Sequence, residues 1–316
     1  MSIVQKVWVK LNKFPQFSIL LSFLVLLVFF SLVADGFLSS RNVIGVLRQS
    51  VVPMCVAAGM TFVLIAGGID LSVGSVACLA GTVMASLMVN AGLSPALAIV
   101  CSLLVGVLLG SINGTIIAYM NIPSIIVTLA MMITARGLSL VYSGARPINE
   151  LPETIIYLGR GYVFGIPIPV LIVALLLTVA GFVLVKTNFG RRIFALGGNE
   201  ECARLSGIHI GRTKIAVFAI SGLCASIAGI ILTMRLASSQ PTMGEGLEMD
   251  AISAAVLGGT SIKGGKGFIF GTLIGCLFLA FLTNGFNVLN VSSFWQQVFK
   301  GVVLVLAVSL YERRKK

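Results

Sequence analysis

Long apolar stretches alternate with short segments rich in glycine, proline and polar residues along the chain. A membrane core about 30 Å thick is spanned by about 20 apolar residues in a helix, and most of the stretches have roughly this length. We therefore predict spans at 17–34, 50–66, 72–90, 94–119, 122–142, 167–185, 214–235, 251–262, 267–289 and 294–311. The pattern predicts an all-α polytopic membrane protein with about ten transmembrane helices, in which residues 1–316 form a single transmembrane domain.

Glycines are expected to break two of these helices, near 67–74 and near 258–267. Each region holds a Gly-Gly pair and, after five residues, a third glycine: Gly67, Gly68 and Gly74 in the first, and Gly258, Gly259 and Gly265 in the second. The echo is compatible with an internal duplication or with chance, because the chain has 35 glycines. Irregular backbone is not tolerated against lipid, so both breaks should lie inside the protein.

The basic residues predict how the chain is oriented. Lys6, Lys10 and Lys13 precede the first span on a short amphipathic segment, and further basic residues gather in the loop 186–214 and at 313–316. Cytoplasmic loops carry an excess of Lys and Arg, so both termini and this loop are expected in the cytoplasm. The segment 251–262 must then cross the membrane as a short broken helix, and 143–166 and 236–250 lie outside.

Composition excludes several classes of protein. With 58% apolar and 10% charged residues, the chain lacks the surface of a water-soluble enzyme. The net charge of +12 does not indicate nucleic-acid binding, because the basic residues follow the positive-inside distribution. The six cysteines form no CxxC pair, which argues against a metal site or a structural disulfide. The Gly265-Lys266-Gly267 run lacks the spacing and hydroxyl of a phosphate loop, so we expect no ATP site.

Asp70 is the single charged residue among the 87 that separate Arg48 from Arg136. A charge at membrane depth costs about 2.5–3.5 kcal/mol on insertion scales and normally faces a cavity or a partner. Its carboxylate is suited to accept backbone N–H groups at the start of the next span, and it is also suited to line a transport path. We take Gly67, Gly68, Asp70, Ser72, Gly74, Gly258, Gly259 and Gly265 as candidates for a gate or hinge.

Other polar residues within spans have two interpretations. Asn113, Thr128 and Asn284 are candidates to line a path of sugar size, or they are hydrogen-bond partners between helices. Arg136 has the same two interpretations, and snorkelling to the outer interface is a third one. The series Gly106, Gly110, Gly114 and Gly267, Gly271, Gly275 place glycines on one helix face, which predicts close packing within or between subunits.

The loop 186–214 is predicted to contain a short helix from Glu200 to Leu205. Asn199 is suited to cap its start, two acids follow in the first turn, and Gly207 is suited to end it. A capped helix in a basic loop is a candidate docking element, and a plain solvated connection is the alternative. The candidate residues for coupling are Gly197, Asn199, Glu200, Glu201, Ala203, Arg204 and Gly207.

Several motifs, in order along the chain, resemble one known family. The octapeptide 67–74, with 122–129, 188–191, 197–199 and 256–261, is similar to the membrane subunits of bacterial ABC importers for ribose and related monosaccharides. Glu201-Cys202-Ala203-x3-Gly207 is also similar to the Glu-Ala-Ala-x3-Gly coupling motif of other importer permeases. Here Cys202 takes the second position, which makes that likeness partial.

The resemblance implies a permease in the bacterial inner membrane that works with other chains. It implies a second permease copy, a cytoplasmic ATPase subunit that binds the ATP, and a periplasmic sugar-binding protein, and the permease itself needs no cofactor. It also implies that 186–214 is the cytoplasmic coupling loop. Permeases of the same superfamily for branched-chain amino acids or a furanone signal are alternatives. A stand-alone channel or secondary transporter, with Asp70 as its ion site, is a further one, although such carriers usually need several intramembrane acids.

Overall fold

The computed structural model describes residues 17–313, so the amphipathic segment predicted before the first span lies outside the described residues. The first half contains α2 (Phe17–Val33), α3 (Ser40–Ile65), α4 (Val73–Val89), α5 (Pro95–Tyr119), α6 (Ser124–Ser143) and α7 (Glu153–Arg160). A small hairpin follows, formed by β1 (Tyr162–Val163) and β2 (Ile166–Pro167). The remaining helices are α8 (Ile168–Lys186), α9 (Asn188–Gly198), α10 (Glu200–Leu205), α11 (Ile210–Leu236), α12 (Leu247–Leu257), α13 (Ile269–Val288) and α14 (Ser293–Arg313).

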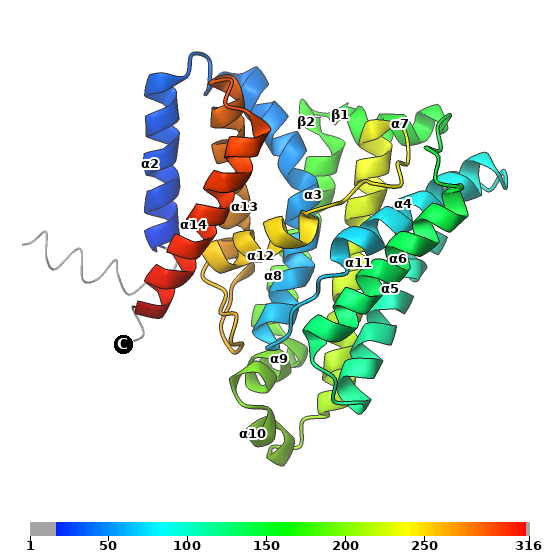
Figure 1. Cartoon of the computed structure of the whole chain (residues 1–316), viewed down its shortest axis with the longest axis vertical. Coiled ribbons are helices and arrows are strands. Elements are labelled where there is room, and N and C mark those ends of the chain that lie inside the picture. The colour runs from blue at the N-terminus through cyan, green and yellow to red at the C-terminus, as the bar shows by residue number, and fades with distance from the viewer. Residues whose placement is uncertain (1–16, 314–316) are drawn as a thin grey trace, which may run out of the picture.

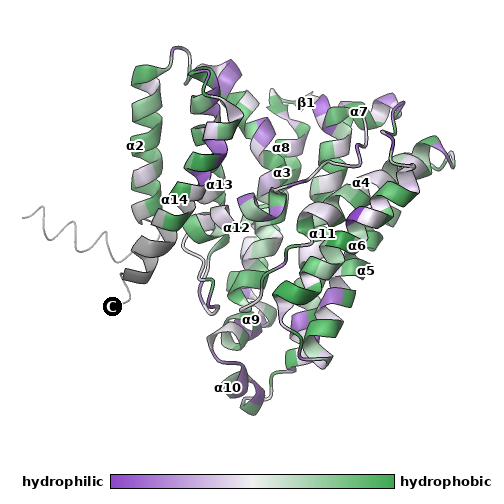
Figure 2. Ribbon diagram, viewed as in Figure 1, coloured by the Kyte–Doolittle hydropathy of each residue, from purple (hydrophilic) through white to green (hydrophobic). Residues whose placement is uncertain are grey.

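The all-α class and the polytopic character are confirmed. Among the described residues, six helices are long and apolar enough to span a membrane, and two shorter apolar helices, 19–33 and 73–89, accompany them. Of the other two predicted spans, α12 has 11 residues and is too short to cross a membrane. In α14, several side chains from residue 303 onward lie outside the described set. Figure 2 shows mainly apolar residues along the helices, with hydrophilic ones at α10 and at the opposite end of the bundle near α7.

The two central helices are α3 and α11, which pack against each other. The two are the most deeply buried of the long apolar helices, and a Cβ added at Gly59 of α3 would lie 2.9 Å from Cys224 Cβ of α11. The helix α3 begins at Ser40, ten residues before the predicted start at 50. The predicted span began with the apolar stretch at 50, but the helix also includes the preceding polar turns with Arg41 and Arg48.

The two glycine series form seams of close packing between helices of this chain. Of the two predicted alternatives, packing within or between subunits, the structure shows packing within the subunit. Along α5, a Cβ at Gly110 would lie 2.2 Å from Phe218 O of α11. Along α13, a Cβ at Gly271 would lie 2.0 Å from Gly258 O at the end of α12. Any larger residue would push these backbones apart, so the seams fix how α5 and α13 sit against their neighbours.

Both predicted breaks are present. Helix α3 ends at Ile65 and α4 begins at Val73, while α12 ends at Leu257 and α13 begins at Ile269. Figure 1 shows α9 and α10 projecting from one end of the bundle, and α7 with the hairpin at the opposite end. The helix α12 lies between these ends, at mid-height.

The position of α12 corrects one prediction. The segment 236–250 was expected to lie outside the membrane, yet it runs from the end of α11 down into the bundle. Asp250 borders a cavity together with Gln49 and Pro53 from the middle of α3. A Cβ at Gly74 would lie 2.4 Å from Gly244 O, and Gly74 is about 22 Å along the axis from the end of α4. The prediction rested on counting an even number of crossings between the basic loop and the basic C-terminal end, which required 251–262 to span the membrane.

Candidate functional site

The first break, residues 66–72, is named here the Asp70 segment. Asp70 is 1% exposed, and its carboxylate is fully engaged. Its Oδ1 accepts the backbone N–H of Ser72 at 3.0 Å and the Ser72 hydroxyl at 2.6 Å, while its Oδ2 accepts the Ser221 hydroxyl from α11 at 2.7 Å. Asp70 thus ties the start of α4 to the central helix α11. It accepts one N–H beside the helix start, which is part of the capping role considered from the sequence.

Side chains of α5 and α6 hold the same segment from the other side. Asn113 Nδ2 donates to Ser72 Oγ at 3.1 Å. Ser124 Oγ accepts from Ile69 N at 3.0 Å, and Thr128 Oγ1 accepts from Leu71 N at 3.1 Å. A non-helical segment lacks the regular internal hydrogen bonds of a helix, so these hydroxyls supply partners for its buried backbone groups. Polar residues from three helices therefore fix the Asp70 segment in place.

The three residues predicted to line a path all have partners within the chain. Asn113 and Thr128 are fully buried and contact the Asp70 segment. Asn284 exchanges two amide hydrogen bonds with Asn42, at 2.8 and 3.0 Å, which joins α13 to α3. A path-lining role stays a prediction for all three.

The second break, residues 258–268, is named here the Gly265 segment. It is held mainly by backbone contacts. Ser261 N donates to Lys266 O at 2.9 Å, and Gly265 N donates to Ile65 O, at the end of α3, at 2.8 Å. Gly264 and Gly265 adopt φ values of +86° and +71°, a left-handed conformation that favours glycine. The two breaks therefore touch each other at the end of α3.

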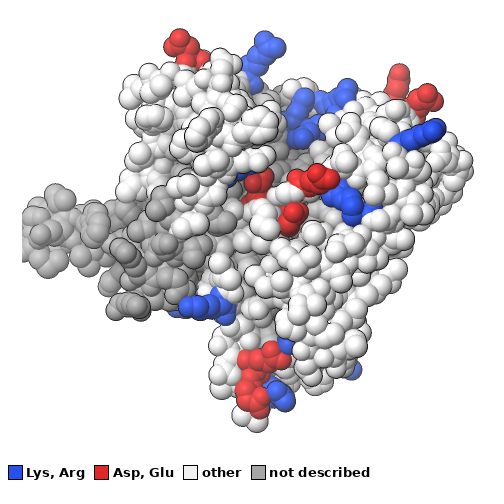
Figure 3. Space-filling model, viewed as in Figure 1, with Lys and Arg blue, Asp and Glu red and all other residues white. Residues whose placement is uncertain are grey.

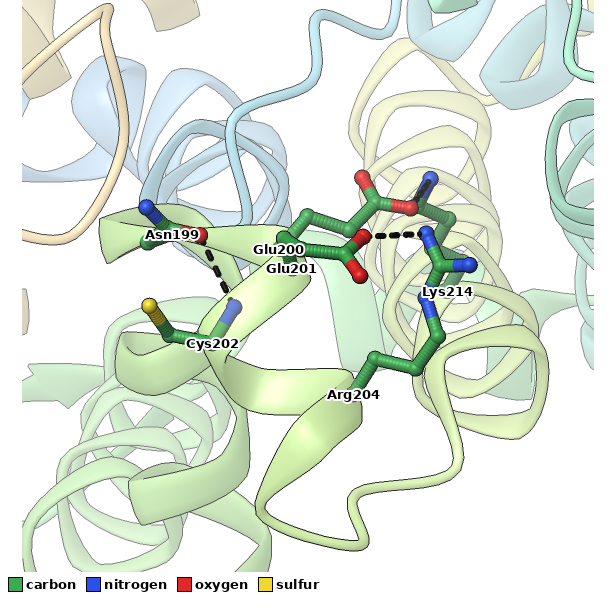
Figure 4. Close-up of polar contacts among 6 residues, drawn as sticks. All are labelled: Asn199, Glu200, Glu201, Cys202, Arg204 and Lys214. Carbon is green, nitrogen blue, oxygen red and sulfur yellow. Dashed lines mark hydrogen bonds and ion pairs between the residues drawn. The ribbon is translucent and has the colours of Figure 1, made fainter.

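The predicted helix in the loop 186–214 is confirmed with its bounds. Asn199 Oδ1 accepts from Cys202 N at 2.9 Å, and α10 runs from Glu200 to Leu205. Glu200 pairs with Lys214 of α11 at 2.8 Å, and Glu201 pairs with Arg204 at 2.7 Å (Figure 4). Ala203 is buried while Leu205 is 81% exposed. One face of α10 thus packs on the protein, and the other is free for a partner.

The end of α9 meets both breaks at one point, which we call the glycine junction (Ile65, Gly67, Gly197, Gly198, Gly264 and Gly265). A Cβ at Gly197 would lie 1.7 Å from Ile65 O and 2.6 Å from Gly265 N. A Cβ at Gly264 would lie 3.0 Å from the Cα atoms of both Gly67 and Gly197. Three backbones approach this closely only where side chains are absent. The glycines predicted separately as hinge and coupling residues are therefore neighbours in space.

A cavity of about 320 Å³ separates α10 from the Asp70 segment. Gly67 and Gly68 line one side, Glu200 and Lys214 another, and the turn 121–124 before α6 a third. The loop 186–214 thus touches the Asp70 segment directly at Gly197, and faces it across open space at Glu200. The cavity thus lies between the start of α10 and the ends of α3 and α6 that face it.

Charged side chains also lie at mid-depth on one face, centred on α12. Figure 3 shows acidic side chains over α12, with basic ones beside them. Glu245 is exposed, and Asp250 pairs with Lys300 of α14 at 3.0 Å. Arg136 of α6 donates to Pro241 O at 2.8 Å and to Met243 O at 2.9 Å. The snorkelling interpretation of Arg136 was wrong, because the side chain holds the segment before α12.

Sequence reasoning missed the anchor Ser221 and did not predict the contacts of Arg136. Ser221 and Arg136 give no motif, and a hydroxyl within a span has many uses. For Arg136 the signal was its charge, since an ionisable residue within a span marks a functional candidate.

Comparison with known proteins now identifies the family. A family model described as "Branched-chain amino acid transport system / permease component" matches residues 42–308. The chain belongs to this permease family. Its permease relatives include the ribose import permease protein RbsC of Haemophilus influenzae, which is 44% identical over 292 residues, covering 91% of this chain and 90% of RbsC.

Two further permeases extend the comparison. RbsC of Bacillus subtilis is 45% identical, with 93% of this chain and 92% of the relative covered. The xylose transport system permease protein XylH of Escherichia coli K12 is 36% identical, with 95% and 92% covered. No solved structure gives a significant match. The resemblance drawn from the octapeptide is confirmed, and the chain is the permease component of an ABC importer, a multi-pass transport subunit distinct from the ATPase.

Proposed function

We propose that this permease carries a monosaccharide, with ribose as the first candidate, across the bacterial inner membrane. The observation that carries the proposal is the identity of 44–45% to ribose import permeases over more than nine tenths of the chain. The xylose permease is a more distant relative at 36%, which favours ribose over xylose. A periplasmic binding protein delivers the sugar, a separate cytoplasmic ATPase supplies the energy, and both termini lie in the cytoplasm.

The loop 186–214 is the proposed coupling element. The free face of α10, with Glu201, Arg204 and Leu205, contacts the ATPase. Closure of the ATPase moves α9 and α10, and the glycine junction passes this movement to the Asp70 segment and the Gly265 segment together. Coupling requires an element with two discrete arrangements, and the cavity beside Glu200 gives space for the second one.

The charged face centred on α12 is the proposed contact face for the second permease copy. Charges at membrane depth avoid lipid, so this face is covered in the assembled transporter. Exposed apolar residues border it on both sides, including Ile126 and Ile133 on α6 and Val298 and Val302 on α14. Contact between copies along these borders leaves the charged centre facing a water-filled path for the sugar.

Reconstitution tests this function directly. The permease and its ATPase are placed in liposomes, with ATP inside and the ribose-loaded binding protein outside, and uptake of labelled ribose is measured. We expect ATP-dependent ribose uptake that excess unlabelled ribose abolishes and leucine leaves unchanged. Uptake of leucine in place of ribose would move the chain to the amino-acid branch of the family. Ribose uptake without ATP, driven by a proton gradient, would identify a secondary transporter.

A further inference from the structure

Three arginines form a closed ring at the end of the molecule opposite α10. Arg48 Nη2 donates to Arg160 O at 2.8 Å, Arg160 Nε donates to Arg235 O at 2.9 Å, and Arg235 Nη1 donates to Arg48 O at 3.1 Å. The ring joins α3, the last residue of α7 and the last turn of α11. We call these residues the arginine ring.

The cations of the ring lack an acidic partner. No carboxylate of the described residues lies within ion-pair distance of these three guanidiniums. Arg48 stacks on Tyr162, with its Cζ 4.8 Å from the ring centroid, and its buried Nε has no hydrogen-bond partner. Like charges held together repel one another. Here hydrogen bonds hold three guanidiniums close together, and each keeps N–H groups that no carbonyl of the ring uses. Such an arrangement is suited to bind an anion from outside the chain.

The shape of the guanidinium specifies the anion. Its planar fork matches the two oxygens of a carboxylate or phosphate, and such bidentate bonds are stronger than neutral ones. Each ring arginine uses one nitrogen for a carbonyl, which orients the guanidinium and leaves other N–H groups. Arg160 is exposed, whereas Arg48 and Arg235 are half-buried.

The position of the ring favours a protein partner over a lipid headgroup. Two of its members belong to α3 and α11, the central and most buried of the long apolar helices, and lipid contacts the outer helices instead. Figure 3 shows basic side chains at this end of the molecule, near the hairpin and α7. In the proposed orientation, this end faces the compartment from which the binding protein arrives.

We propose that the arginine ring is a docking site for a surface carboxylate of the secreted binding protein. The inference rests on the proposed function, because it requires a binding protein. An aspartate or glutamate on that protein bonds to Arg160 first and reaches toward Arg235. The contact positions the delivered sugar over the centre of the permease and neutralises charge that the chain leaves unpaired.

Charge reversal at the exposed member tests the site. The permease with its ATPase is placed in nanodiscs, and the Kd for the ribose-loaded binding protein is measured for wild type, Arg160→Glu, Arg160→Lys and Arg146→Glu. Arg146 is the matched control, because it is an exposed arginine at the same end outside the ring. We expect Arg160→Glu to weaken binding at least about tenfold, Arg160→Lys to weaken it less, and Arg146→Glu to change it less than about twofold. Thermal unfolding of each variant checks that the fold is kept.

The alternatives give different results. Unchanged binding by a folded Arg160→Glu permease overturns the docking site and leaves the transport function standing. Wild-type permease that binds no binding protein overturns both. The measurement is repeated in nanodiscs of phosphatidylcholine alone and of phosphatidylcholine with phosphatidylglycerol. A loss confined to the anionic lipid assigns the ring to a lipid headgroup and overturns the proposal.

Discussion

The two breaks share a glycine spacing but are held by different forces. In the Asp70 segment, Asp70, Ser124 and Thr128 bind backbone or hydroxyl groups, and every one of these contacts has a direction. In the Gly265 segment, contacts with α9 and α3 are made mainly by backbone, through the Gly265 N–Ile65 O hydrogen bond and the close approach of glycines. Side chains from three helices thus brace the first break, whereas a backbone hydrogen bond and close glycine contacts join the second to α3 and α9. We infer that the first break is the more firmly anchored of the two and that the second yields first when the glycine junction moves.

The largest expected effect comes from removing the anchor. Asp70→Ala leaves Ser72 N and the Ser221 hydroxyl buried without their acceptor. Each unsatisfied buried group costs about 1–3 kcal/mol, so we expect roughly 2–6 kcal/mol of destabilisation. The transition in thermal unfolding of the purified permease measures this loss, and ribose uptake should fall with it.

The matched change Asp70→Asn separates anchoring from charge. Its amide oxygen still accepts from Ser72, so membrane level and thermal unfolding should stay near those of wild type. We expect uptake to fall severely, because the carboxylate and its charge are lost. Wild-type uptake by Asp70→Asn would restrict Asp70 to a structural role.

The next largest effect is expected at the glycine junction. A Cβ at Gly197 would lie 1.7 Å from Ile65 O, whereas a Cβ at Gly198 would meet nothing within 4 Å. Overpacking costs about 1–3 kcal/mol, which shifts an equilibrium between two arrangements about 5- to 150-fold. Gly197→Ala should therefore reduce uptake strongly while ATP hydrolysis by the complex continues, and Gly198→Ala should keep both.

Equal uptake by the two alanine variants would remove the junction from the mechanism. Parallel loss of uptake and of ATP hydrolysis in Gly197→Ala would point to failed assembly with the ATPase instead. The control is strict because both substitutions replace a glycine with alanine at neighbouring positions of α9. They differ only in the atoms that surround the new methyl group.

The sequence predicted what depends on local chemistry. The helix 200–205 was predicted with its bounds because Asn199, two acids and Gly207 all act within one turn. The glycine breaks at 67–74 and 258–267 were found for the same reason. The partners of Asp70 could not be predicted, since Ser221 lies 151 positions away and its hydroxyl resembles any other in a span.

Errors arose where contacts with distant parts of the chain, and not the local sequence, determine where a segment lies. Asp250 pairs with Lys300 beside a cavity at mid-height of the bundle, whereas the count of membrane crossings placed 236–250 in an outer loop. The start of α3 was misplaced because Arg48 lies within the helix and donates to Arg160 O, a contact that is invisible in the sequence. The glycine junction was missed as a unit because it joins three segments far apart along the chain.

A smaller effect is expected when one brace of the Asp70 segment is removed. Thr128→Val keeps the shape of the side chain but leaves Leu71 N without its acceptor. We expect about 1–2 kcal/mol of destabilisation and a partial loss of uptake. Thermal unfolding measured beside Asp70→Ala should rank the two, with Thr128→Val the milder; the reverse order would contradict the anchoring role of Asp70.

The same substitution in the Gly265 segment should do the least harm and so sharpens the comparison. Thr260 is 1% exposed, and its hydroxyl has no hydrogen-bond partner. A buried hydroxyl without a partner is unfavourable, so Thr260→Val should leave thermal stability unchanged or raise it by up to about 1 kcal/mol, with uptake kept. A loss as large as that of Thr128→Val would mean that directed polar contacts hold both breaks. The same chemical change is thus expected to lower thermal stability at Thr128 and to keep or raise it at Thr260, because the two segments are held in different ways.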